Sequence, residues 1–378
     1  QTDISMMKIH YVIYLGCLLA AGPVKSQQVQ QTTATKEIPS LKAVFAGDFV
    51  IGTALNAAQV EGRDPRAALL VPQQFNVATP ENVMKAAPIH PEWGRYNFGP
   101  ADALVEYGRN NNIGINAHTL IWHSQLPRFA QQLQSIDSFR LFFQEHIKTV
   151  AGRYSGKVLS WDVVNEALNE DGSMRKSVFL DKLGDDYVTE AFRLAQEASP
   201  NTVLYYNDYN NEQPAKRAGC IALIKKVQAA GVRIDGVGIQ GHWSLGKIPL
   251  KHIEQSILEY AALGIKVAIT ELDIEVLPRN FQGADVNQRM QATPSTNPYV
   301  NGLPDSVQQQ LAADYRALFQ LFLKHRDKID RVTFWGVNDG NSWLNGWPVR
   351  GRTNYPLLFD REYQPKPAFW AVVGLKNK

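Results

Sequence analysis

Two glutamates stand at the ends of apolar segments of this chain. Glu166 follows the run WDVVN, and Glu271 follows the run VAIT. Burying a carboxylate there is costly unless the carboxylate is paired or used in a reaction. Two carboxyl groups that face each other across a cleft can cleave a glycosidic bond: one gives a proton to the leaving oxygen, and the other attacks or stabilises the oxocarbenium-like carbon. Either glutamate alone could instead be the ion-pair partner of a structural Arg or Lys.

The segments around these glutamates alternate between strand and helix patterns. Short runs rich in β-branched and aromatic residues predict strands, and apolar residues at helical spacing between them predict amphipathic helices. Because no glycine-rich phosphate loop follows the first strand, we expect an α/β fold with a single (β/α)8 TIM barrel rather than an open doubly wound sheet. The predicted strands are 49–55, 75–81, 114–122, 158–166, 202–210, 234–243, 266–275 and 331–339, and the clearest helices are 138–154, 185–198, 215–231, 251–264 and 312–329. A long polar segment, 275–306, predicts an extended loop after strand seven.

Polar side chains gather where the predicted strands end. In a barrel, the carboxyl ends of the strands carry the active site. At one strand such a residue marks only the change to a solvated loop, but the same pattern at seven strands predicts a single pocket. The residues at these ends are Glu81, Asn82, His118, Trp122, His123, Asn165, Glu166, Asn207, Asp208, Tyr209, Gln240, His242, Glu271, Asp273, Trp335, Asn338 and Asp339.

Composition narrows the class of partner. The net charge of +3 and the lack of a basic run with interleaved aromatics argue against a nucleic-acid or membrane-surface binder. The chain has 14 Tyr, 16 Phe and 8 Trp, whose flat faces suit stacking on sugars as well as core packing. His118 and His123 lie on an extended segment, and no HExxH or CxxC pattern occurs, so we expect neither a metal nor a cofactor. Cys220 is predicted to be a buried, inert thiol.

The N-terminal region has the pattern of a targeting segment. Lys8 precedes the apolar run 9–21, which is too short to span a bilayer and is typical of a secretory signal peptide. We therefore expect a signal peptide over 1–26, a flexible leader over 27–40 and the (β/α)8 catalytic domain over 41–378, with secretion or a periplasmic location. YLGC, ending at Cys17, faintly resembles a lipoprotein cleavage box, so lipid anchoring to the cell surface is the alternative. A buried N-terminal helix is a third interpretation.

Five motifs carry a resemblance to a known family. HTLIWHSQLP, WDVVNEAL, YYNDYN, ITELDIEV and FWGVND resemble, in order and spacing, the glycoside hydrolase family 10 endo-β-1,4-xylanases, and the resemblance extends from about residue 45 to residue 370. It implies an enzyme that hydrolyses internal β-1,4-xylosidic bonds of xylan and xylo-oligosaccharides with retention of configuration. We expect this enzyme to be a monomer. By motif, Glu166 would be the general acid/base and Glu271 the nucleophile. Because Glu166 must start protonated, we expect burial and the Glu271 charge to raise its pKa.

The resemblance also implies roles for the surrounding residues. Asn165 would bind the sugar 2-hydroxyl, and His242 with Asp273 would orient Glu271 and keep it ionised. The implied substrate contacts are Asn82, Lys85, His118, Trp122 and Gln240 on the non-reducing side, Tyr209 on the leaving-group side, and Trp335 and Trp343 as stacking faces. Ala86 follows Lys85 where the family usually has an aromatic residue, which leaves the wall beside the non-reducing sugar in doubt.

Several assignments stay open from the sequence. Asn207 and Asp208 fit a bracing role at the barrel rim as well as sugar contact, and Trp347 fits core or pocket. Arg350 and Arg352 fit salt bridges in the last loop. Two other functions also remain: β-1,4-glucanase or cellobiosidase activity within the same family, and non-catalytic polysaccharide binding on a barrel scaffold.

Overall fold

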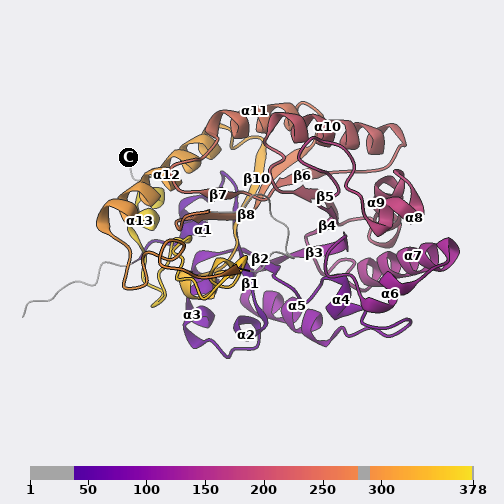
Figure 1. Ribbon diagram of the computed structural model, residues 1–378, viewed down its shortest axis with the longest axis horizontal. Coiled ribbons are helices and arrows are strands. Elements are labelled where there is room, and N and C mark those ends of the chain that lie inside the picture. Colours follow the sequence, from indigo (N-terminus) through magenta and orange to yellow (C-terminus); the bar gives the residue numbers. More distant parts are fainter. Residues whose placement is uncertain (1–37, 280–289, 377–378) are drawn as a thin grey trace, which may run out of the picture. The chain divides into compact units, whose positions relative to one another are not determined.

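The computed structural model describes residues 38–279 and 290–376, which form a closed parallel barrel (Figure 1). The predicted signal peptide, Cys17 and most of the leader lie outside the described residues. The barrel order is β1, β2, β3, β4, β5, β6, β8 and β10, and β10 pairs with both β8 and β1 to close it. The prediction of a (β/α)8 barrel is confirmed. The strands are β1 Val50–Leu55, β2 Val77–Pro80, β3 Gly114–Trp122, β4 Ser160–Asn165, β5 Val203–Asp208, β6 Gly236–Ile239, β8 Lys266–Glu275 and β10 Ile329–Phe334.

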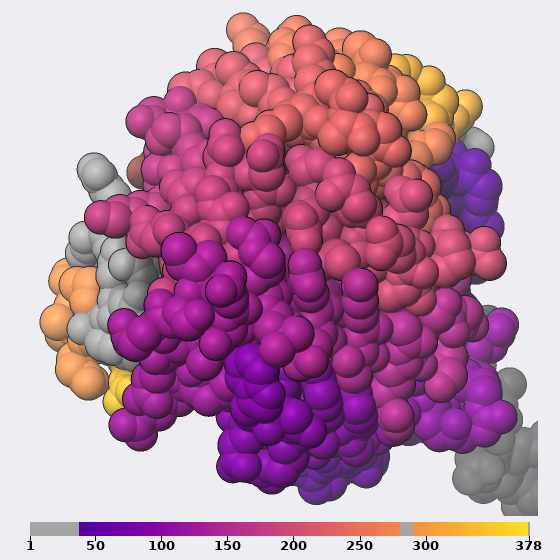
Figure 2. All heavy atoms as spheres, turned by 90° about the vertical axis from the view of Figure 1, so that its right-hand side faces the viewer, coloured from indigo at the N-terminus to yellow at the C-terminus, as the bar shows by residue number. Residues whose placement is uncertain are grey.

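Helices surround the strands and bury their apolar faces against the barrel. All five predicted helices are present, although α12 begins at Asp305, because Pro304 precedes it and Asp305 occupies its first turn. The longer helices are α3 Pro65–Gln74, α5 Gly99–Asn111, α7 Ile136–Arg153, α9 Tyr187–Ala198, α10 Pro214–Ala229, α11 Leu250–Ala261 and α12 Asp305–Lys324. Shorter ones are α1 Leu41–Val44, α2 Ala57–Val60, α4 Ala86–Ile89, α6 Arg128–Gln132, α8 Val178–Leu183 and α13 Pro367–Val373. The face in Figure 2 is built mostly from the middle of the chain.

The predicted sixth strand is divided in two. β6 ends at Ile239, and β7, His242–Ser244, pairs with the far end of β8 instead of continuing β6. Gly241 makes the break with φ +85°, a left-handed conformation that glycine adopts at little cost. The turn places Gln240 and His242 at the barrel mouth beside the end of β8.

The segment after β8 is the predicted extended loop. Residues 276–279 and 290–304 connect β8 to α12, and β9, Met290–Gln291, pairs in parallel with β11, Val349–Arg350. Arg352 lies 2.5 Å from Glu275 in a buried ion pair, whereas Arg350 is exposed on β11. Of the two arginines expected to form salt bridges in the last loop, Arg352 therefore forms one with Glu275.

Cys220 is fully buried, as predicted, and burial raises the pKa of its thiol to about 12. No helix in residues 38–279 or 290–376 is both long and apolar enough to cross a membrane.

Candidate active site

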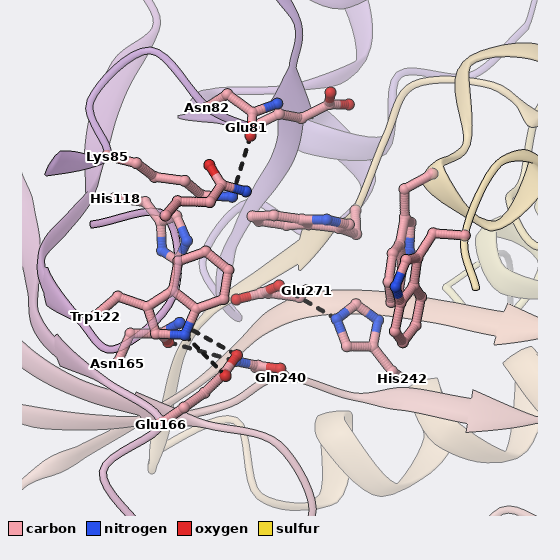
Figure 3. A pocket seen from close by; sticks show the side chains of 14 residues that line it. Glu81, Asn82, Lys85, His118, Trp122, Asn165, Glu166, Gln240, His242 and Glu271 are labelled. Carbon is pink, nitrogen blue, oxygen red and sulfur yellow. Dashed lines mark hydrogen bonds and ion pairs between the residues drawn. The ribbon is translucent and has the colours of Figure 1, made fainter. Parts of the chain in front are cut away.

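A pocket opens at the carboxyl ends of the barrel strands, where the polar residues were predicted to converge (Figure 3). The carboxyl groups of Glu166 and Glu271 both point into it. Residues from separate strand ends thus form one site, because the closed parallel barrel brings all those ends to the same face. The lining residues are Glu81, Asn82, Lys85, His118, Trp122, Gln125, Asn165, Glu166, Gln240, His242, Glu271, Trp335, Trp343 and Trp347.

Glu166 directly follows β4 and is held by hydrogen-bond donors from neighbouring strand ends. Trp122 Nε1 donates to its Oε2 at 2.8 Å, and Gln240 Nε2 donates to its Oε1 at 3.1 Å. Asn165 Nδ2 also donates to Oε1, at 3.2 Å. These contacts fix both oxygens of the carboxylate within the pocket.

The pKa of Glu166 is lowered in the free protein, so the expected rise is wrong. Burial acts to raise this pKa, but electrostatic attraction to His123, the hydrogen bonds from Trp122 and Gln240, and the charge of Arg175 outweigh burial. The expectation considered only burial and the charge of Glu271 as influences on this pKa. The hydrogen-bond donors reach the carboxylate only in the folded barrel, so the sequence did not reveal them.

Glu271 lies within β8 and is almost fully buried. Asn207 Nδ2 donates to its Oε1 at 2.8 Å, and His242 Nε2 lies 3.2 Å from its Oε2. The other nitrogen of His242, Nδ1, lies 3.0 Å from Asp273 Oδ1, and Trp343 Nε1 donates to Asp273 Oδ2 at 2.7 Å. The predicted Glu271, His242 and Asp273 chain is therefore present as a geometric arrangement.

His242 is positively charged at neutral pH in this arrangement. Burial acts to lower its pKa, but the charges of Asp273 and Glu271 and hydrogen bonds to both carboxylates raise that pKa to about 10. An imidazolium carries a proton on each ring nitrogen, so it donates to both carboxylates at once.

One wall of the pocket contains a buried lysine. Lys85 Nζ lies 3.3 Å from Asn82 Oδ1 and 4.8 Å from the ring centre of Trp122. Burial lowers the pKa of Lys85 against the opposing pull of Glu271, Glu166 and Glu81. Burial likewise raises the pKa of Glu81 to about 7, opposed by the Lys85 charge. Glu81 was placed at a strand end but not among the implied sugar contacts.

Aromatic rings shape the remaining walls. His118 is oriented by Asp162, with Nδ1 2.9 Å from Oδ2, and its ring meets Trp335 edge-on at 5.5 Å. Trp343 stacks on Trp347 at 4.6 Å between ring centres, so Trp347 belongs to the pocket rather than to the core alone.

The structure places some predicted residues away from the pocket. Tyr209 is buried and does not line it: its hydroxyl accepts a hydrogen bond from Arg175 Nη2 at 2.7 Å, and Lys216 Nζ lies 3.7 Å from the centre of its ring. Asp208 pairs with Lys216 at 2.9 Å. Asn207 braces the site, because its Nδ2 reaches both Asn165 Oδ1, at 2.9 Å, and Glu271.

Gln125 and Arg175 were missed by the sequence analysis. Gln125 follows closely after His123 and lies within the motif HTLIWHSQLP, and its position beyond a strand end was a second signal. Arg175 lies far enough from any predicted strand that nothing in its surroundings indicated a role. Within the described ranges, no group of three or more His, Cys, Asp or Glu side chains is placed to hold a metal ion.

A family model for glycosyl hydrolase family 10 matches residues 40–375. The chain belongs to glycosyl hydrolase family 10. This confirms the resemblance carried by the five motifs. Endo-1,4-beta-xylanase A of Xylanibacter ruminicola is 40% identical over 89% of this chain and 93% of its own length. Beta-1,4-xylanase of Dictyoglomus thermophilum is also 40% identical, over 89% of this chain and 91% of its own length.

Solved structures of family 10 proteins share the fold of this chain. A family 10 endoxylanase from a sugarcane soil metagenome superposes with a TM-score of 0.85 at 41% identity, covering 89% of this chain and all (100%) of that one. Xylanase XynB of Paenibacillus barcinonensis, in complex with a conduramine derivative, has a TM-score of 0.81 at 35% identity, covering 90% of this chain and 99% of that one.

Proposed function

We propose that this family 10 protein is an endo-1,4-β-xylanase that hydrolyses internal bonds of xylan and xylo-oligosaccharides with retention of anomeric configuration. The observation that carries the proposal is the pair Glu166 and Glu271 in one pocket, in a chain 40% identical to named xylanases over most of its length. Most glycosidases cleave their substrates with one pair of carboxyl groups that flank the scissile bond.

Glu271 acts as the nucleophile in the first step. A carboxylate oxygen of Glu271 forms a bond to the anomeric carbon while the bond to the leaving glycosidic oxygen breaks, and that oxygen takes the proton of Glu166. The product of this step is a glycosyl ester on Glu271 and an ionised Glu166. His242, held by Asp273, keeps the Glu271 carboxylate oriented before the attack.

Glu166 acts as the base in the second step. It takes a proton from water, the water oxygen attacks the anomeric carbon, and the bond to Glu271 breaks. Donors that lower the pKa of Glu166 in the free protein favour its ionised form, which this step needs. The first step instead needs the protonated form, so activity should fall as rising pH ionises Glu166.

Replacement of the nucleophile tests the proposal. Glu271→Ala should abolish the release of reducing sugar from xylan while the far-UV circular dichroism spectrum stays that of the unmodified protein. NMR of the first product of the unmodified enzyme should show the β-anomer. A folded, active Glu271→Ala protein would contradict the assignment, and an initially α-configured product would contradict the double displacement.

A second candidate substrate is β-1,4-glucan. A thermostable celloxylanase of Thermoclostridium stercorarium is 34% identical over 98% of this chain and 95% of its own length. Glucose differs from xylose by a hydroxymethyl group, which must fit beside Lys85, Trp335 and Trp343. We expect xylan to be hydrolysed much faster than carboxymethyl cellulose in a side-by-side assay. Comparable rates on both would favour the wider specificity.

Secretion and a monomeric state also belong to the proposal. Secretion is supported by the apolar run 9–21 and by the polymeric nature of xylan, which has to be degraded outside the cell. Expression with residues 1–26 attached should yield a shortened protein outside the cytoplasm, with its new N-terminus read by mass spectrometry. Labelling of Cys17 by a fatty-acid probe would favour lipid anchoring instead, and light scattering measures the oligomeric state.

A further inference from the structure

The backbone of Glu166 has an unusual conformation that its neighbours hold in place. Its φ of +59° lies in the left-handed region, which side-chain-bearing residues rarely adopt and which persists only when the surroundings over-determine it. Its amide nitrogen donates to the Asn207 carbonyl at 2.9 Å, and the next amide, of Ala167, donates to the Tyr206 hydroxyl at 3.1 Å. The remaining polar group of this turn is the carbonyl of Glu166.

Arg175 binds that carbonyl. Its Nε donates to Glu166 O at 2.9 Å, and its Nη2 donates to Leu168 O at 3.1 Å and to the Tyr209 hydroxyl at 2.7 Å. A guanidinium is planar with its donors at fixed angles, so contacts from two of its nitrogens set the position of the peptide relative to Tyr209. Tyr209 is itself buried, and Lys216 Nζ lies over its ring.

A hairpin of residues 167–175 brings Arg175 back to Glu166. Leu168 pairs with Met174 in antiparallel fashion, and Arg175 N donates to Ala167 O at 2.7 Å. Its turn is packed tightly against α10: a methyl group added at Gly172 would lie 2.5 Å from Ala215 O, and one added at Gly219 would lie 2.1 Å from Gly172 O. The sequence from Ala167 to Arg175 thus forms a fixed bracket rather than a loose loop.

We infer that Arg175 is a positioning residue for the general acid, holding the Glu166 carbonyl so that the carboxyl group reaches the glycosidic oxygen. The inference rests on the proposed function. Arg175 does not line the pocket and donates to the backbone of Glu166, so it acts on the reaction through the position of Glu166. Its positive charge also favours the ionised form of Glu166.

Leaving-group dependence separates this role from a structural one. Departure of a sugar hydroxyl needs the proton of Glu166, whereas departure of dinitrophenolate does not. We expect Arg175→Met to lower kcat/KM on xylotetraose by roughly 10–100-fold, because a displaced general acid loses most of its effect. On 2,4-dinitrophenyl β-xylobioside, kcat/KM should change by less than about threefold. The basic limb of the xylotetraose pH profile should also move to higher pH.

Two variants control the experiment. Arg153→Met removes a similar charge from α7, where Arg153 pairs with Asp102 at 2.5 Å, and should leave both substrates unaffected. Arg175→Lys keeps the positive charge but loses the planar pair of donors. Its kcat/KM on xylotetraose should fall by less than that of Arg175→Met, again with little change on the dinitrophenyl substrate. This variant also tests the inference if Arg175→Met does not fold. Equal losses on both substrates, or no loss on xylotetraose, overturn the inference. An unmodified protein inactive on both substrates contradicts the proposed function instead.

Discussion

Asn207 Nδ2 lies 2.8 Å from Glu271 Oε1 and 2.9 Å from Asn165 Oδ1, so one amide on β5 joins the candidate nucleophile to the residue beside the candidate acid. Its own Oδ1 accepts a hydrogen bond from Thr270 Oγ1 at 2.6 Å, which fixes which end of the amide faces the carboxylate. The two glutamates are therefore positioned by a shared, buried group, and a substitution of Asn207 should affect both of them.

Asn207→Asp should shift the acid limb of the activity profile. The substitution puts a second carboxylate beside Glu271, and like charges this close favour uptake of a proton by the pair. Because the nucleophile must be ionised, the acid limb of kcat/KM on an aryl xylobioside should move to higher pH. Asn207→Ala, which adds no charge, should lower kcat/KM without moving that limb. Identical profiles for the two variants would show that charge is not the cause.

Loss of the imidazolium should change how stability depends on pH. The pKa of His242 is raised from 6.5 to about 10 in the folded state, so the folded protein binds more protons than the unfolded one between those values. Its contribution to stability is complete below about pH 6.5 and is lost as pH rises towards 10. The melting temperature of the unmodified protein should therefore fall over this range, and that of His242→Gln should fall less. Parallel curves would contradict the assigned charge.

Trp122→Phe should extend activity to higher pH. The indole N–H favours the ionised form of Glu166 from 2.8 Å, and its removal should raise the pKa of Glu166 by roughly one unit. Glu166 would then stay protonated to higher pH, and the basic limb of kcat/KM would move in the same direction. Rates on xylotetraose across about pH 3–7, a range that spans the ordinary glutamate pKa of about 4.3, measure this shift. A shift to lower pH would show that the indole acts on Glu166 in another way.

A buried histidine pair should limit stability in acid. His90 Nδ1 and His146 Nδ1 face each other at 3.2 Å, and His146 Nε2 lies 3.1 Å from Leu120 O. Burial lowers the pKa of His90 to about 4 and that of His146 to about 3, so the unfolded state takes up protons first as pH falls below 6.5. Stability should decline from there towards pH 3.

His146→Gln tests this origin of acid sensitivity. The glutamine can keep a donor towards Leu120 O but cannot take up a proton, so its melting temperature should fall less between pH 7 and pH 4 (about the span over which a buried histidine titrates). His252→Gln, at an exposed histidine, is the matched control and should follow the unmodified protein. If His146→Gln also follows it, other groups cause the decline.

Most of the fold followed from local patterns. β3 and β8 coincide with their predicted ranges, because β-branched and aromatic residues mark buried parallel strands with clear ends. The prediction was wrong in detail where a turn intervened, as at Gly241, since a single glycine does not reveal that the next strand pairs elsewhere. Strand ends also located Glu166 and Glu271, because a polar residue after a buried strand stands out against its apolar neighbours.

The sequence by itself determined the barrel, the two glutamates and the family, because short local patterns of residue types identify each of them. Only the tertiary structure decided the protonation tendency of Glu166, the bracing by Asn207, the removal of Tyr209 from the pocket and the bracket around Arg175. Each of these depends on groups from separate strands or turns meeting within about 3 Å, the range over which hydrogen bonds act. Such distances are set by how the strands close into a barrel, which no local stretch of sequence records.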